Sequence, residues 1–352
     1  MDGKIKMCNR GFHACESPFD VFDYYTMIDS RFCEVEQDGN ISKEDRGTKI
    51  CSSKIKIKAE LKLANMINLG VEWLKEITSP EKIKTSIKDN SSGNYAKIGS
   101  SGDEAKIGSS GNNAQIGSSG YGAKIGSSGN NAQIGSSGYG AKIGSSGNDA
   151  KIGSSGNNAQ IGSSGYGAKI GSSGNDAQIG SSGNNAQIGS SGDGAQIGSS
   201  GYGAKIGSSG NNAQIGSSGN NAQIGSSGYG AKIGSSGNDA QIGLSGNNAQ
   251  IGSSGDGAQI GSSSDGAKIS SSGYSAKIDS TGEDCVIMCA GINSVAKASK
   301  GSWITLSEWS YSEGKQRYIP ICVKTEFVDG EKIKADTYYS LKGGVFVEWI
   351  ND

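Results

Sequence analysis

An isoleucine recurs every nine residues through the middle of the chain. The series runs without a slip from Ile98 to Ile278 and comprises 21 units, each of the form Ala-x-Ile-Gly-Ser-Ser-Gly-x-x. A repeat of fixed length indicates one small structural unit that is copied and stacked. This period therefore constrains the fold more than any other feature of the sequence.

Within each unit, the Ala-x-Ile triplet has the two-residue period of a β-strand. Ala and Ile then share one face, and the Lys or Gln between them faces outward. Sequence rich in Gly and Ser is also typical of disordered linkers, but a linker has no reason to hold Ile and Ala in a fixed phase. One strand and one corner per unit predict a β-solenoid over residues 91–284, with the right-handed winding usual for parallel strands.

The cross-section of this solenoid depends on the number of units in one coil. Two units would make a flattened coil of about 18 residues with two parallel sheets, and three would make a triangular coil of about 27 residues. We expect the coil of two units, because Ile facing Ala closes a narrow interior and Ser fills the remaining space. The two fixed glycines of each unit are expected at corners where the backbone has a positive φ.

Nine-residue repeats also occur in calcium-binding β-rolls, which carry an Asp at a fixed place in each unit. Only some units carry Asp at the corresponding place, for example Asp149, whereas Asn113 and Gly122 occupy it in others. The sequence therefore predicts neither calcium nor any other cofactor.

The two flanking regions do not follow the repeat. Residues 1–90 predict a small α+β domain, with a helix that starts at Ser17-Pro18, a strand in "SSKIKIKAEL" that directs Ile57 inward, and a helix in "ANMINLGVEWLKEI". Residues 285–352 contain the strand-like segments "SWITLSEW", "RYIPICVKTEFV" and "GGVFVEW". The fold class is therefore mainly β: a solenoid with an α+β N-terminal domain and a β-rich C-terminal cap, which protects the open sheet edges.

Charge and composition exclude several classes of function. The net charge is −1, and residues 95–284 contain ten Lys against eleven Asp and Glu, so neither nucleic-acid binding nor DNA mimicry is expected. No apolar run is long enough to span a membrane, and the first residues lack the apolar core of a signal peptide. Seven cysteines without a spacing framework favour free thiols and a cytoplasmic location.

The two ends of the chain carry a family resemblance. The segments "GFHACESPFDVFDYY", "SRFCEVEQDGNIS" and "SSKIKIKAEL" resemble the N-terminal domain of an uncharacterised group of phage and prophage proteins. In that group the domain is followed by nonapeptide repeats and by a segment similar to "IKADTYYSLKGGVFVEW". The resemblance implies a bacteriophage setting inside a bacterial host, and it supplies no catalytic residue.

Three functions remain open at this point. The first hypothesis is an interaction protein that binds a bacterial host protein and inhibits a defence system; the second is a component of the virion or tail. The third is an enzyme in residues 1–90, where Cys8, His13 and Cys15 could bind a metal or form a nucleophilic pair. We favour a structural role for His13, because the spacing matches no standard metal site.

Recognition of a protein partner needs aromatic or basic anchors. Anchors at the two ends of the chain would provide most of the affinity, while repeated Tyr side chains would add contacts along the solenoid, and self-association is also open. The candidate partner-binding residues are His13, Tyr24, Tyr25, Tyr121, Tyr166, Tyr202, Tyr229, Trp303 and Trp309.

Overall fold

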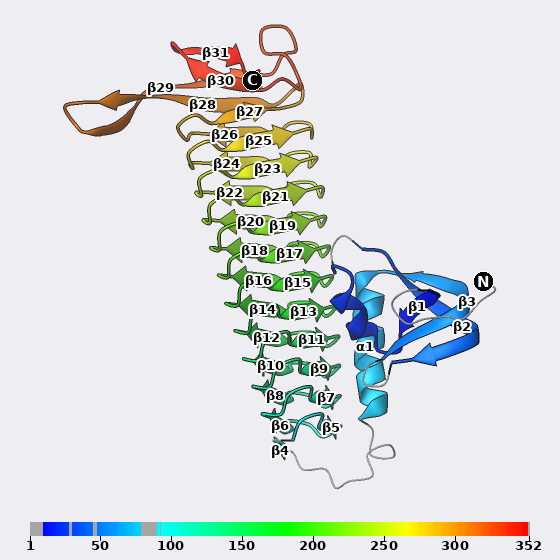
Figure 1. Cartoon of the computed structure of the whole chain (residues 1–352). Helices are drawn as coiled ribbons and strands as arrows, with labels where there is room; N and C mark the ends of the chain where they lie inside the picture. Colours follow the sequence, from blue (N-terminus) through cyan, green and yellow to red (C-terminus); the bar gives the residue numbers. More distant parts are fainter. Residues whose placement is uncertain (1–9, 28–29, 45–47, 79–89, 92, 351–352) are drawn as a thin grey trace. The chain divides into compact units, whose positions relative to one another are not determined.

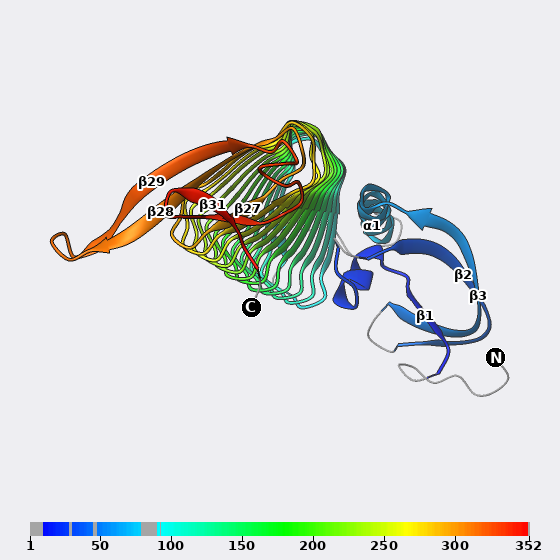
Figure 2. The ribbon, with the colours of Figure 1, turned by 90° about the horizontal axis from the view of Figure 1, so that it is seen from above.

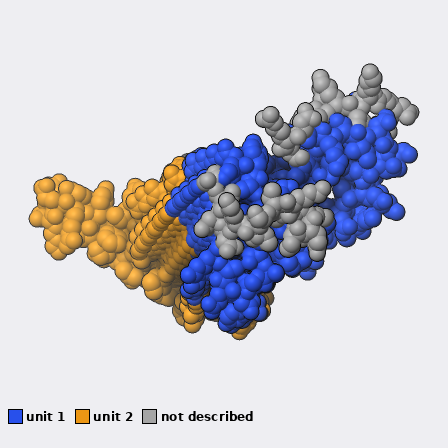
Figure 3. Space-filling model, turned by 90° about the horizontal axis from the view of Figure 1, so that it is seen from below, with its two compact units in different colours: residues 1–179, 186–192 blue, residues 180–185, 193–352 orange. Residues whose placement is uncertain are grey.

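The structure is a computed structural model that describes residues 10–27, 30–44, 48–78, 90–91 and 93–350. The protein is mainly β and contains a parallel β-solenoid of about 12 turns with about 18 residues per turn. It has two compact units (Figure 3): unit 1 is residues 1–179 with 186–192, and unit 2 is residues 180–185 with 193–352.

Each repeat forms one four-residue strand, and successive repeats contribute alternately to two sheets (Figure 1). The strands of the even sheet are β4 (Asn90–Ser91), β6 (Lys106–Ser109), β8 (Lys124–Ser127), β10 (Lys142–Ser145), β12 (Gln160–Ser163), β14 (Gln178–Ser181), β16 (Gln196–Ser199), β18 (Gln214–Ser217), β20 (Lys232–Ser235), β22 (Gln250–Ser253), β24 (Lys268–Ser271) and β26 (Val286–Cys289). The strands of the odd sheet are β5 (Lys97–Ser100), β7 (Gln115–Ser118), β9 (Gln133–Ser136), β11 (Lys151–Ser154), β13 (Lys169–Ser172), β15 (Gln187–Ser190), β17 (Lys205–Ser208), β19 (Gln223–Ser226), β21 (Gln241–Leu244), β23 (Gln259–Ser262), β25 (Lys277–Ser280) and β27 (Val295–Lys297).

The register confirms the predicted coil of two repeats. Ile143 in β10 pairs with Ile161 in β12, which is two repeats later, and the same residue types stay aligned along each sheet. Ile161 and the Ala two residues before it are buried, as is Ser163. Together with their equivalents in other repeats they form the narrow Ile, Ala and Ser interior that the sequence predicts.

The corners differ from the prediction in one respect. The positive φ lies at the second residue of the variable pair, for example Asn113 (58°) and Gly122 (65°), and not at the fixed glycines. Asn, Asp and Gly tolerate this left-handed conformation better than other residues, which explains their use at this place. The prediction of positive φ at the fixed glycines is therefore wrong.

The second fixed glycine is needed because consecutive coils approach closely. A Cβ atom added at Gly165 would lie 2.0 Å from the carbonyl oxygen of Gly147, one coil earlier. The first residue of the variable pair supports the same stacking: the backbone N–H of Asn130 donates to Oδ1 of Asn112 at 2.9 Å. These contacts repeat along the corners. Stacking of the coils therefore requires the second fixed glycine and favours Asn or Asp as the first residue of the variable pair.

The N-terminal region, within unit 1, is α+β as predicted. It contains β1 (Phe12–Cys15), the 3-10 helix η1 (Pro18–Asp23), β2 (Phe32–Lys43), β3 (Lys49–Leu61) and α1 (Leu63–Ile77), and the sheet order is β1-β3-β2. Ser17 precedes η1, as expected from the Ser-Pro pair. Among the described residues, no helix is long and apolar enough to cross a membrane.

The inward direction predicted for Ile57 is wrong, because its side chain is 67% exposed. Ile67, Val71 and Leu74 on α1 are fully buried, but α1 packs against strands β7, β9, β11 and β13 of the solenoid (Figure 2). The apolar face of α1 thus packs on the solenoid, and the part of β3 around Ile57 is left exposed.

The C-terminal region, within unit 2, continues the two sheets and then departs from the repeat. β26 pairs with β28 (Trp303–Ser312), which forms a long antiparallel hairpin with β29 (Arg317–Phe327). β27 pairs with β30 (Tyr339–Lys342), which pairs with β31 (Val345–Glu348). The β28–β29 hairpin extends sideways past the end of β26 (Figure 1 and Figure 2).

Candidate protein-binding surfaces

In unit 1, the odd sheet binds the N-terminal region through a strip of glycines. The glycine after each core Ile points outward, so these strands present bare backbone at this place. Phe19 covers Gly153 and Leu74 covers Gly135; a Cβ atom at these glycines would lie 2.3 Å and 2.9 Å from the respective side chains. The absence of side chains on the sheet is therefore what allows η1 and α1 to pack closely.

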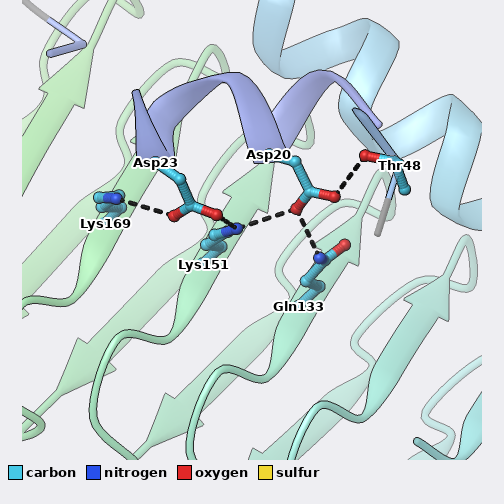
Figure 4. A network of polar contacts seen from close by, with 6 residues as sticks. All are labelled: Asp20, Asp23, Thr48, Gln133, Lys151 and Lys169. Carbon is cyan, nitrogen blue, oxygen red and sulfur yellow. Dashed lines mark hydrogen bonds and ion pairs between the residues drawn. The ribbon is translucent and has the colours of Figure 1, made fainter. Parts of the chain in front are cut away.

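A polar network lies beside this apolar contact (Figure 4). Asp20 and Asp23 of η1 reach the outward Lys and Gln side chains of three consecutive odd-sheet strands. The contacts are Gln133 Nε2 to Asp20 Oδ1 (2.8 Å), Lys151 Nζ to Asp20 Oδ1 (2.9 Å), Lys151 Nζ to Asp23 Oδ2 (2.7 Å), Lys169 Nζ to Asp23 Oδ1 (3.2 Å) and Thr48 Oγ1 to Asp20 Oδ2 (2.6 Å).

Lys151 is the central cation of this network, and its side chain is only 9% exposed. Burial by itself disfavours the charged ammonium, but the carboxylates of Asp20 and Asp23 outweigh burial and raise the pKa of Lys151 above its ordinary value. The lysine therefore stays charged at neutral pH and holds η1 on the sheet.

The position of the network along the sheet follows from the order of the repeats. In unit 1 the outward positions of the odd sheet are Lys97, Gln115, Gln133, Lys151, Lys169 and Gln187. Two lysines are consecutive at one place only, and this is where Asp20 and Asp23 bind. These residues were not predicted from the sequence. Their only local signal is the pair Asp20 and Asp23, three residues apart, because the number of repeats in a coil decides which lysines face this pair.

The even sheet of unit 1 presents the same surface without a covering domain. A Cβ atom added at Gly126 or Gly144 would meet no other atom within 4 Å. Beside these glycines, Lys106, Lys124 and Lys142 form a row of three exposed lysines. Their ammonium groups have no ion pair or hydrogen bond with any residue that the structure describes.

The predicted anchor Tyr121 lies at the corner that precedes this row, together with Tyr139, which was not predicted. The rings of Tyr121 and Tyr139 are stacked, with centres 5.4 Å apart and an interplanar angle of 6°. Both rings are about half exposed. The even sheet of unit 1 therefore combines a flat strip, a row of cations and an aromatic pair.

The other predicted tyrosines of the repeat are also exposed, but they are dispersed. Tyr166 lies at the opposite corner, which precedes the odd-sheet strands. In unit 2, the hydroxyls of Tyr202 and Tyr229 accept hydrogen bonds from Asn221 (2.6 Å) and Asn248 (2.8 Å) of the next coil. Within unit 2, Tyr202 precedes an odd-sheet strand and Tyr229 an even-sheet strand, so these two residues lie at opposite corners.

Three predicted residues of the N-terminal region line a common cleft of about 1000 Å³. His13 lies on β1, and Tyr24 and Tyr25 follow η1. The ammonium of Lys49 lies 4.1 Å from the centre of the Tyr24 ring. Apolar side chains such as Phe32 line part of the cleft, and charged side chains such as Arg31 and Glu34 line other parts. The cleft therefore offers both apolar and polar contacts to a ligand.

Cys15 also lines this cleft, but its thiol is poorly suited to nucleophilic catalysis. Burial, together with the nearby Asp20 carboxylate, raises the pKa of Cys15 to about 11. Cys8, the other cysteine of the metal-site hypothesis, lies outside the described residues. The residues that the structure does describe contain no cluster of three His, Cys, Asp or Glu side chains able to hold a metal ion.

The two predicted tryptophans lie on β28 in unit 2 and differ in their surroundings. Trp303 is exposed and packs against Phe327, with ring centres 5.1 Å apart. The indole N–H of Trp309 is directed to the carbonyl of Ala290 (3.1 Å) and the hydroxyl of Ser307 (2.8 Å). Trp303 is thus available to a partner, whereas Trp309 is tied to the protein's own backbone.

Comparison with known proteins gives one match. Residues 1–69 match the model of a protein family described as a domain of unknown function, DUF7666. No curated protein and no solved structure is significantly similar to the chain. The similarity therefore covers β1, η1, β2, β3 and the first half of α1, and lies outside the repeat.

Proposed function

We propose that the chain is an interaction protein of a phage or prophage, which binds a bacterial host protein in the host cytoplasm and inhibits a defence system. The resemblance of both ends to phage and prophage proteins supports the setting. All six cysteines among the described residues are free thiols, which supports a reducing compartment.

One observation carries the binding function. In unit 1 the outer face of the odd sheet already binds a folded domain, through bare glycine backbone and Lys–Asp pairs. The even sheet repeats the same elements, with Gly126 and Gly144 uncovered and three lysines unpaired among the described residues. A surface with this chemistry suits a helical segment that carries acidic side chains beside an aromatic or aliphatic one, as η1 does.

The alternative of an enzyme in the N-terminal region has less support. The raised pKa of Cys15 leaves its thiol protonated at neutral pH, which disfavours this thiol as a nucleophile. We therefore assign the cleft to binding, as a second surface of the same interaction protein.

The test starts with tagged full-length protein and lysate of a bacterial host. Captured proteins are identified by mass spectrometry, and each candidate is purified and its affinity is measured by calorimetry. We then expect the double substitution Lys124→Gln and Lys142→Gln to weaken the affinity by at least about 10-fold, because it removes two charge-assisted contacts.

The matched control is Lys232→Gln, the same replacement on the even sheet of unit 2. Gln occupies this outward position in many repeats, so neither variant should disturb the fold. Unchanged affinity in the double variant, with a verified partner, would contradict the assignment of binding to the even sheet.

A further inference from the structure

The β28–β29 hairpin in unit 2 has one face without any charged residue. Ile304 and Leu306 are buried on the core side, so the alternate residues of β28 point to the outer side. The cross-strand pairs of that outer side are Trp303–Phe327, Thr305–Thr325, Ser307–Val323, Trp309–Pro320 and Tyr311–Tyr318. We call these ten residues the uncharged hairpin face.

The charged residues of the two hairpin strands lie on the opposite side, and three of the four have partners; the four are Glu308, Arg317, Lys324 and Glu326. Glu308 accepts hydrogen bonds from the backbone N–H groups of Gly343 and Gly344, at 2.8 Å and 2.9 Å. Glu326 forms ion pairs with Lys324 (3.1 Å) and Lys332 (2.8 Å). The hairpin is therefore amphipathic, and the separation of charge between its faces is not explained by contacts with the solenoid core alone.

The apolar surface continues from the hairpin onto the last repeat strand of the even sheet. Val286 and Met288 of β26 pair with Trp303 and Thr305, at the places where other repeats have Lys or Gln and Gly. Val286 is 49%, Met288 49%, Trp303 48%, Phe327 41% and Val323 63% exposed. A contiguous exposed surface of this kind marks an interaction site.

The odd sheet of unit 2 is different at the corresponding place. The ammonium of Lys277 lies over the rings of Tyr338 (4.4 Å) and Trp349 (4.9 Å), so the C-terminal segment covers this end of the sheet. Val295, which pairs with Lys277, is buried. The chain thus covers the end of the odd sheet with its own residues and leaves the end of the even sheet uncovered.

We propose that a second copy of this chain covers the uncharged hairpin face, in a two-fold symmetric dimer. In a two-fold interface the same face meets itself, and this face can do so without burying any charge. A ten-residue strand is about 33 Å long and strands lie about 4.8 Å apart, so β26, β28 and β29 present roughly 400 Å² as a flat sheet. The large side chains project from this sheet and increase its accessible surface above the flat-sheet value. A standard interface buries roughly 800 Å² per partner.

The contact is between faces rather than between strand edges. Pro320 lies in the middle of β29 and has no N–H to donate, and the register shifts between Glu308 and Trp309. Both features disfavour pairing along the free edge of β29. Face-to-face packing leaves the backbone unchanged and buries Val323 near the centre, with Trp303 and Phe327 at one end of the contact.

Sedimentation equilibrium of the full-length chain tests this inference. The chain has a mass of 35.8 kDa, and we expect a dimer of twice this mass at micromolar concentration. Val323→Glu should weaken self-association by at least about 30-fold, as expected for a central interface residue. Met288→Glu, in the neighbouring strand, should have the same effect.

The matched control is Val345→Glu, because Val345 is also an exposed valine (53%) but lies on β31 of the other sheet. It should dimerise like the wild type, and circular dichroism at a concentration where the wild type is monomeric should show the same melting temperature for all variants. A wild-type chain that stays monomeric up to 100-fold higher concentration overturns the inference, as does a dimer whose affinity is unchanged in Val323→Glu or lost in Val345→Glu.

Discussion

The ring of Phe19 lies directly on Gly153, so closely that a Cβ atom on this glycine would come within 2.3 Å of the ring. Gly144 is in an identical Lys-Ile-Gly-Ser strand of the other sheet, and a Cβ atom there would meet nothing within 4 Å. Identical repeats thus have different surroundings, and substitutions that are equal in sequence should have unequal effects.

The first prediction concerns this pair of glycines. Gly153→Ala should loosen the N-terminal region, because Phe19 must move; we expect a cost of about 1–3 kcal/mol, as for other overpacked contacts. Hydrogen exchange of the α1 amides should accelerate accordingly. Gly144→Ala should leave that exchange unchanged, and equal exchange rates in the two variants would contradict the packing of η1 on the odd sheet.

The second prediction concerns two glycines of one repeat. Gly165→Ala should lower the melting temperature of the solenoid strongly, because the new methyl group would lie 2.0 Å from a backbone oxygen of the previous coil. Gly162→Ala should be neutral or slightly stabilising, because the space is open and Ala costs less backbone entropy than Gly. Circular dichroism melts compare the two; a larger loss in Gly162→Ala would mean that the coils stack differently.

The third prediction concerns Lys151 and pH. Because its folded-state pKa is raised, its contribution to stability is fully present below its ordinary pKa of 10.5 and is lost as the pH rises through the raised value. We expect Lys151→Gln to lower the stability of the N-terminal region by about 2 kcal/mol at neutral pH, since charged hydrogen bonds are lost. The difference from the wild type should be constant up to pH 10 and shrink above it.

The control for this measurement is Lys142→Gln, the same replacement at an exposed lysine of the even sheet. Melting curves recorded between neutral and alkaline pH should coincide for this variant and the wild type. A difference between Lys151→Gln and the wild type that did not shrink at all as the pH rose above 10.5 would show that the ammonium charge is not the cause.

The fourth prediction concerns the serines of the core. The hydroxyl of Ser163 is buried and forms no hydrogen bond with any described residue. An unpaired buried hydroxyl costs free energy, so Ser163→Ala should be neutral or stabilise the fold by up to about 1 kcal/mol. Leu244 already replaces the equivalent serine and is buried. Urea denaturation would detect the change, and a marked destabilisation would indicate a hydrogen bond that the hydroxyl makes.

Sequence reasoning located the interior of the solenoid but not its outer contacts. Ile161 and Ser163 could be placed inward because a strand alternates its side chains, and their neighbours are the same in every coil. Asp20 and Lys151 are 131 residues apart in sequence, and nothing local relates them. The inward direction predicted for Ile57 fails for the same reason, because the helix that could cover it packs on the solenoid instead.

The nine-residue period by itself determined the solenoid and its Ile, Ala and Ser interior, because each coil has the same neighbours above and below. The period allowed coils of two or three repeats, and the strand register decided for two. The choice of Asn, Asp or Gly as the second residue of the variable pair also has a local cause, because the backbone there has a positive φ. Only the tertiary structure decided that Gly153 is covered and Gly144 is open. Their strands are identical in sequence, so the burial of each glycine depends on which side chains from distant parts of the chain pack against it. The repeated sequence does not specify those side chains.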